Sequence, residues 1–156
     1  AEAGDLTIVK YPGEDVEAVA ELVMSIDNTG LLAEKGVGVD ASGIGDIIDA
    51  LTGHGFELDR IVGIPQGWKL GAAIKTTERK LAGGDLVHCG RPMMAWCVGN
   101  ARVEPRGNAI VITKQASGKA KIDPLMSLFN CCALLAMNPQ NAGPIIYPSD
   151  YRVRFA

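Results

Sequence analysis

A short strand followed at once by a helix, within residues 36–51, is the sequence feature that most constrains the fold. Val37 and Val39 are β-branched residues typical of a buried strand, and Ser42 is placed to cap the helix. The apolar residues after Ser42 recur at the spacing of one helical face: Ile44, Ile47, Ile48 and Leu51. Asp40 then lies at the carboxyl end of a strand, the edge where open α/β sheets bind ligands. Asp40 is therefore a candidate catalytic or ligand-binding residue, although an Asp at such a turn also accepts hydrogen bonds from backbone N–H groups.

The same alternation of strand and helix extends to both sides of this unit. Residues 6–9 predict a first strand, and an apolar stripe predicts a helix from residue 14 to about residue 28. A further strand is expected at residues 61–64, after a glycine break. The order strand, helix, strand, helix, strand is typical of a parallel sheet with right-handed crossovers.

The second half of the chain predicts more helices and one hairpin. Helices are expected from about residue 68 to residue 81, after Pro92, and from Asp123 to about residue 137. Residues 101–104 and 109–113 flank a turn and predict an antiparallel pair that joins the parallel strands. Helical spacing places among the core residues Leu81, Met93, Trp96, Cys97, Cys131 and Cys132. We therefore expect an α/β fold with a mixed sheet flanked by helices.

The composition is that of a single globular domain with enough apolar residues to form a hydrophobic core. The chain has 156 residues, of which 47% are hydrophobic, and it contains no apolar run of about 18 residues and no signal-peptide pattern. We expect a soluble cytoplasmic protein without a membrane partner. The four cysteines form no CxxC pair, as expected of reduced thiols. A zinc site of His88, Cys89 and Cys97 lacks a second ligand pair and is disfavoured.

Charge is divided unevenly along the chain. Residues 1–60 contain 3 Lys or Arg and 13 Asp or Glu, whereas residues 61–156 contain 12 and 5. A basic surface beside acidic residues suits a polyanion held next to metal-binding carboxylates, and two solvated faces would give the same counts. The residues expected to contact DNA are Lys69, Lys75, Arg79, Lys114, Lys119 and Lys121.

Two carboxylates stand out as candidate metal ligands. Asp40 ends a strand, and Asp123 begins a helix after a Lys-rich loop, with Pro124 following it. Asp123 before Pro124 also has the pattern of a simple N-cap. Hydrolysis of a phosphodiester with two divalent cations requires several convergent carboxylates, which are the hard oxygen ligands of Mg²⁺ or Mn²⁺.

The order of these elements resembles the C-terminal nuclease domain of the large terminase subunit of tailed bacteriophages. The resemblance covers most of residues 5–137. Its elements, in chain order, are residues 36–40 (GVGVD) with the helix after them, 63–68 (GIPQGW), 75–81 (KTTERKL), 88–96 (HCGRPMMAW), 100–103 (NARV) and 119–123 (KAKID). This resemblance assigns residues 1–137 to a partial nuclease domain and residues 138–156 to a C-terminal tail.

The resemblance implies an RNase H-like fold and a metal-dependent endonuclease that cuts concatemeric double-stranded DNA during genome packaging. Asp40 is similar to the second metal-binding acid of the family and Asp123 to the third, with Mg²⁺ or Mn²⁺ as cofactor. The implied partners are double-stranded DNA, the terminase ATPase domain, the small terminase subunit and the portal, in the cytoplasm of a bacterial host.

The first acid of the family lies on an earlier strand that we do not find in this chain. Asp5 precedes a strand instead of lying in one. We therefore expect a fragment, such as a prophage remnant or one piece of a split gene, whose missing strands leave a sheet edge exposed for pairing with a second copy. With two of three acids, the fragment is expected to bind metal weakly and to be poorly active or inactive alone.

Two alternatives belong to other classes of protein. A non-catalytic module that binds DNA or packaging partners would use the same basic residues. A small-molecule-binding α/β domain is the weakest alternative, because residues 71–76 lack the leading glycine of a phosphate-binding loop and no dinucleotide fingerprint follows a strand.

Overall fold

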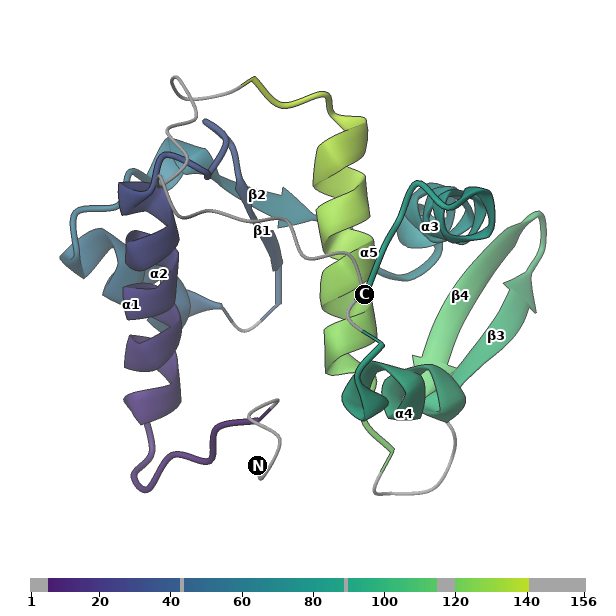
Figure 1. The fold of residues 1–156 in the computed structure, drawn as a ribbon, viewed down its shortest axis with the longest axis horizontal. Helices are drawn as coiled ribbons and strands as arrows, with labels where there is room; N and C mark the ends of the chain where they lie inside the picture. Colours follow the sequence, from purple (N-terminus) through teal and green to yellow (C-terminus); the bar gives the residue numbers. More distant parts are fainter. Residues whose placement is uncertain (1–5, 43, 89, 115–119, 141–156) are drawn as a thin grey trace.

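A computed structural model describes residues 6–42, 44–88, 90–114 and 120–140 as a mixed α/β chain with two small sheets (Figure 1). Helices and strands alternate through the first half, and a hairpin separates two helices in the second. The elements are α1 (Glu14–Asn28), β1 (Val37–Asp40), α2 (Gly45–Gly53), η1 (Leu58–Arg60), β2 (Ile61–Ile64), η2 (Gly67–Leu70), α3 (Gly71–Gly83), α4 (Pro92–Asn100), β3 (Ala101–Arg106), β4 (Ala109–Lys114) and α5 (Asp123–Ala136).

The first sheet consists of β1 and β2, which pair in parallel as the strand–helix–strand pattern predicts. The register runs from Val37 opposite Ile61 to Asp40 opposite Ile64. Successive side chains of a strand point to opposite faces, so Val37 and Ile61 lie on one face, whereas Gly38 and Asp40 share the other face with Ile64. Both faces of this small sheet are covered by helices.

One face of the sheet is covered by α1 and α2. Buried Ala20, Leu51 and Phe56 form the centre of this cluster, and Val37 and Ile61 pack against them. Two polar contacts hold its rim. In the first, the Arg60 guanidinium donates two hydrogen bonds to the Asp27 carboxylate, with lengths of 2.8 and 2.5 Å. The same guanidinium lies over the Phe56 ring, with its carbon atom 4.5 Å from the ring centre. The second joins the helices through His54 Nε2 and Glu17 Oε1, 2.6 Å apart.

The opposite face is covered by α5, which runs beside β1 in the opposite direction (Figure 1). Ile64 is fully buried here, together with side chains of η2, α3, α4 and α5. Contact between β1 and α5 is close at Gly38, where a Cβ atom would lie 2.7 Å from Leu134 Cδ1 and 3.1 Å from Ile64 Cγ1. Glycine therefore lets α5 lie directly on the strand that ends in Asp40.

The second sheet is the hairpin of β3 and β4, in which Ala101 lies opposite Lys114 and Arg106 opposite Ala109. The hairpin was predicted correctly, but the prediction that it joins the parallel strands in one sheet was wrong. It forms a separate two-stranded sheet, and α5 and α3 lie between the two sheets (Figure 1). The structure thus confirms the mixed α/β class, although the single mixed sheet is absent from the described residues.

Several local predictions are also corrected. Residues 6–9 form no strand, since no described strand lies beside them and an isolated extended segment has no hydrogen-bond partners. Ser42 does not cap α2, whose N-cap is Ile44. Three residues that were predicted to lie in the core are exposed instead: Leu81 at the end of α3, Trp96 on α4 and Cys131 on α5.

Other predictions concern parts of the chain that are not described. The tail beyond residue 140, Lys119 and Cys89 lie outside the described residues. None of the described helices is both long and apolar enough to cross a membrane.

The Gly38 contact predicts a clear difference between two Gly→Ala variants of the same sheet. Gly38→Ala should lower the free energy of unfolding by about 1–2 kcal/mol, because its Cβ would overlap Leu134. Gly63→Ala, whose Cβ would meet only Ala41 Cβ at 3.9 Å, is the matched control and should be neutral or slightly stabilising. Urea unfolding of both variants measures the difference. Equal stability would contradict the packing of α5 on β1.

The Asp27–Arg60 pair predicts a pH dependence of stability. The hydrogen bond from Arg60 holds the Asp27 pKa below its ordinary value of 3.8. A carboxylate with a lowered pKa stabilises the fold fully above its unfolded pKa, and this contribution is lost as the pH falls through the folded pKa. Asp27→Asn should therefore lower the free energy of unfolding by about 1–3 kcal/mol at pH 7, and the gap should narrow below about pH 4. Exposed Glu21, on the same helix, supplies the control variant Glu21→Gln.

Candidate metal and DNA site

Asp40 lies at the carboxyl end of β1, as the strand–helix turn predicts. Its Oδ1 accepts a hydrogen bond from the backbone N–H of Ser42 over 3.0 Å, so one oxygen does serve the turn. Within the described part of the chain no hydrogen bond or ion pair occupies Oδ2, and the residue is exposed. Asp40 can therefore hold the turn and still offer an oxygen to a cation.

A side-chain bridge joins the carboxyl edge of the sheet to α5. Gln66 Nε2 donates to the carbonyl oxygen of Ile64 and to Oδ1 of Asn130, each over 3.0 Å. Ile64 is the register partner of Asp40, so this bridge lies at the same edge of the sheet. Sequence reasoning missed the bridge, because two neutral amides 64 residues apart carry no local signal.

Asp123 is the first residue of α5, and it is not the N-cap. The N-cap is Ile122, and no side-chain capping hydrogen bond is formed. The simple capping alternative for Asp123 is therefore wrong. Its carboxylate is exposed and, among residues that the structure describes, has no hydrogen bond or ion pair. Such an oxygen pair is open to a cation.

The two carboxylates lie on facing elements. Residues Asp123, Asn130 and Leu134 follow at spacings of 7 and 4, which places them on one face of α5. Leu134 lies over Gly38, and Asn130 is bonded to Gln66, so this face of α5 looks toward the sheet. Asp40 is on the sheet face that looks toward α5, and Asp123 is about 10 Å along the helix axis from Asn130.

Figure 1 shows β1 ending beside the middle of α5, with the amino end of α5 further along, next to α4. Asp40 and Asp123 therefore lie on the facing sides of β1 and α5, and Ser127 lies between Asp123 and Asn130 on the same face of α5. Among residues 6–42, 44–88, 90–114 and 120–140, three or more metal-ligating side chains nowhere form a group that could hold a metal ion. The facing sides of β1 and α5 offer carboxylate oxygens from two separate positions.

The pKa of the Cys97 thiol on α4 is affected by Asp123, but Cys97 itself is not a candidate metal ligand. Burial raises the pKa of the Cys97 thiol, and the negative charge of Asp123 raises it further. A neutral thiol is a poor metal ligand. In the disfavoured zinc site, His88 Nδ1 instead accepts a hydrogen bond from the backbone N–H of Gly90 over 3.0 Å.

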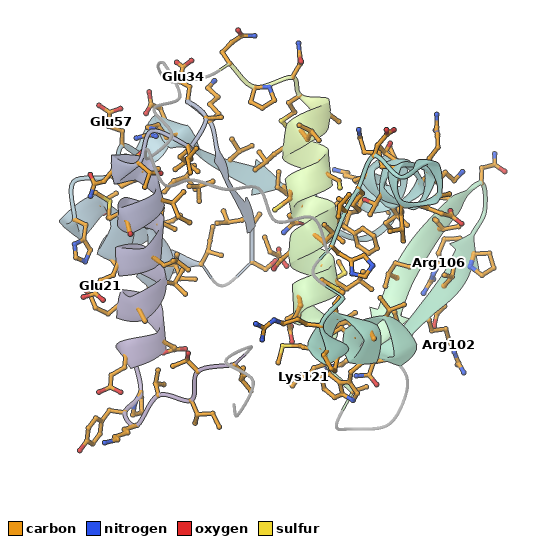
Figure 2. All side chains as sticks on the ribbon, viewed as in Figure 1. Glu21, Glu34, Glu57, Arg102, Arg106 and Lys121 are labelled. Carbon is orange, nitrogen blue, oxygen red and sulfur yellow. The ribbon has the colours of Figure 1, made fainter. Side chains whose placement is uncertain are left out.

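The uneven charge of the sequence is also a separation in space. Glu21, Glu34 and Glu57 lie on the side of α1 and α2, whereas Arg102 and Arg106 lie on the hairpin and Lys121 lies before α5 (Figure 2). The described residues predicted to contact DNA are all exposed: Lys69, Lys75, Arg79, Lys114 and Lys121. Arg102 and Arg106 are also exposed on the hairpin but were not among the predicted DNA contacts, because alternation in a strand did not show which face would be open. The basic side of the molecule is accessible to a polyanion.

Comparison of this chain with models of protein families, with curated proteins and with solved structures finds no match.

A metal-binding measurement tests whether Asp40 and Asp123 both bind a cation. Mn²⁺ binding, followed by electron paramagnetic resonance of the free ion, should weaken about tenfold or more in Asp40→Asn and in Asp123→Asn, since each variant removes an anionic oxygen ligand. Asp46→Asn removes an exposed acid from the first turn of α2 and should leave binding unchanged. Equal binding by all three variants would contradict a site at these two residues.

Proposed function

We propose that this chain is part of a metal-dependent endonuclease of the terminase large-subunit type, with an RNase H-like fold, that cuts double-stranded DNA during packaging of a phage genome. The observation that carries the proposal is that two exposed carboxylates, Asp40 and Asp123, lie on facing elements, β1 and α5. The ordered sequence resemblance and the exposed basic side support it independently.

The chemistry follows from what these residues can hold. Bound Mg²⁺ or Mn²⁺ would supply positive charge to the phosphate and favour the attacking hydroxide. Asp40 and Asp123 would hold the cation through ionised oxygens, and the turn at Ser42 would fix the orientation of the Asp40 carboxylate. The Gln66–Asn130 bridge would keep α5 in register with the strand ends. Small displacements of reacting groups reduce rates strongly, so this positioning matters.

DNA is the proposed substrate because its backbone suits the basic side of the chain. Lys69, Lys75, Arg79, Lys114, Lys119 and Lys121 are the proposed phosphate contacts. The ATPase domain, the small terminase subunit and the portal are the proposed partners, in the bacterial cytoplasm. A second copy is a further proposed partner, since no described strand pairs with the outer edge of β1.

A second candidate function is that of a non-catalytic DNA-binding module. It is favoured by one observation, namely that three or more metal-ligating side chains nowhere form a group among the described residues. Loss of one part of a two-cation clamp removes several kcal/mol of transition-state stabilisation. Such a module would bind DNA with strong salt dependence and without need of a divalent cation.

A plasmid-nicking assay with Mn²⁺ separates the two functions. The endonuclease predicts nicking that falls at least 100-fold in Asp40→Asn and in Asp123→Asn, while Asp46→Asn retains it. Nicking that survives Asp40→Asn would overturn the assignment of Asp40. An intact plasmid, together with salt-dependent binding that EDTA does not change, would favour the non-catalytic module.

A further inference from the structure

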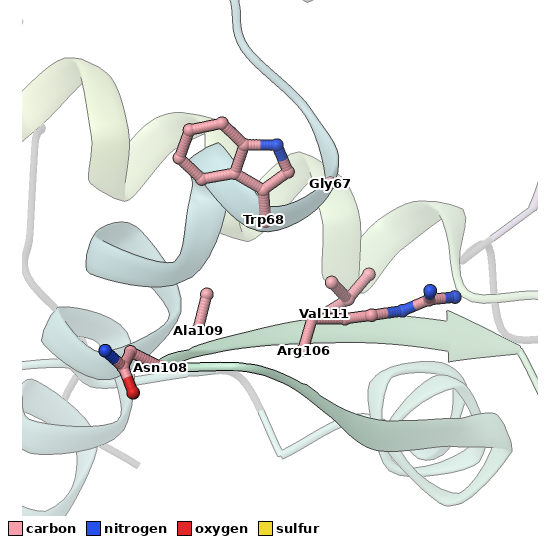
Figure 3. Close-up of a pocket in the computed structure, with 6 residues that line it drawn as sticks. All are labelled: Gly67, Trp68, Arg106, Asn108, Ala109 and Val111. Carbon is pink, nitrogen blue, oxygen red and sulfur yellow. The ribbon is translucent and has the colours of Figure 1, made fainter.

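An open pocket of about 570 Å³ lies between η2 and the tip of the β3–β4 hairpin (Figure 3). None of its lining residues is a proposed metal ligand or one of the proposed phosphate contacts. Its lining residues are Gly67, Trp68, Arg106, Asn108, Ala109 and Val111.

Trp68 is the main surface of this pocket. Its side chain is 63% exposed, and Figure 3 shows the indole standing over Ala109 at the hairpin. Gly67 has φ +66°, a left-handed conformation that glycine adopts without strain, and it turns the chain just before Trp68. Across the pocket, Ala109 carries only a methyl group, so a flat ring has room beside the indole.

The polar groups of the pocket suit a nucleotide. Arg106 lines the hairpin side of the pocket, and Lys69, which is next to Trp68 but does not line the pocket, has its Nζ over the indole ring, 5.7 Å from the ring centre. Within the described residues Arg106 has no ion pair, so its guanidinium is available to a phosphate. Asn108 adds an amide that can donate to and accept from a base edge. An aromatic face with cations beside it is the arrangement that proteins use to bind single-stranded nucleic acid.

We propose that this pocket binds an unpaired nucleotide of a DNA strand, with its base stacked on Trp68 and its phosphates near Arg106 and Lys69. A base within a duplex has both faces covered by its neighbours, so stacking on Trp68 requires an unpaired nucleotide. The proposal deepens the proposed function and rests on it. It adds a subsite for single-stranded DNA on the segment that leaves the carboxyl edge of β2, where Trp68 follows Gln66 by two residues.

Fluorescence tests this subsite, because the chain has two tryptophans and only one of them lines the pocket. Trp96, on α4, is 51% exposed and serves as the matched control. With Trp96→Phe, the emission of Trp68 should be quenched when a short oligo-dT is added in EDTA. With Trp68→Phe, the emission of Trp96 should not change.

Affinity measurements separate stacking from charge. Trp68→Leu should weaken oligo-dT binding about tenfold, and Trp68→Phe, which keeps a ring, should restore most of it. An abasic oligonucleotide of equal length should bind the unsubstituted chain about as weakly as oligo-dT binds Trp68→Leu. Circular dichroism establishes that each variant is folded, and the Trp68→Phe result stands if Trp68→Leu does not fold.

Equal affinity for the abasic strand, or quenching of Trp96 in place of Trp68, would overturn the subsite. Its failure is distinguishable from failure of the nuclease proposal, since binding is measured without metal and Asp40→Asn should leave it unchanged. Loss of nicking in Asp40→Asn with full oligo-dT binding supports both proposals, whereas nicking without base-dependent binding overturns the subsite alone.

Discussion

The parallel pairing of β1 with β2 is the interaction on which the described structure depends. Two strands of four residues each separate two hydrophobic clusters, and neither cluster is closed without them. Ile61 packs toward α1 and α2, whereas Val62 and Ile64 pack toward α3, α4 and α5. Because side chains alternate along a strand, one register fixes both packings and sends Asp40 to the side of α5. A slip of one residue would exchange the two faces and remove Asp40 from that side.

Much of the local structure could be predicted, because local periodicity and glycine or proline punctuation determine it. The helices at residues 14–28, 71–83 and 123–136 and the strands at 37–40 and 61–64 all carry such signals. Pairing between distant segments carries none. Residues 6–9 have strand-like composition but no partner beside them, and the hairpin is separated from β1 and β2 by helices that the sequence could not position.

The candidate site also contains residues that the sequence could predict and contacts that it could not. The place of Asp40 at a strand end follows from a general rule. The role of Asp123 as a metal ligand stays a prediction, whereas the capping alternative for Asp123 was wrong. The bridge between Gln66 and Asn130 and the pocket at Trp68 arise from contacts between segments far apart in the chain. Helical spacing placed Trp96 in the core, yet it faces solvent, because a spacing identifies one side of a helix without showing whether another element covers it.

The separation of acidic and basic residues on opposite sides gives the molecule an electric dipole. In the field of a polyanion such a dipole experiences a torque as well as a net force. A chain of overall charge −3 would be repelled as a point charge, but as a dipole it turns its basic side toward the polyanion before any contact forms. Raising the ionic strength shortens the range of this torque to about 10 Å at 0.1 M. Orientation on approach is therefore a property of where the charges lie, and the overall charge of the chain does not reveal it.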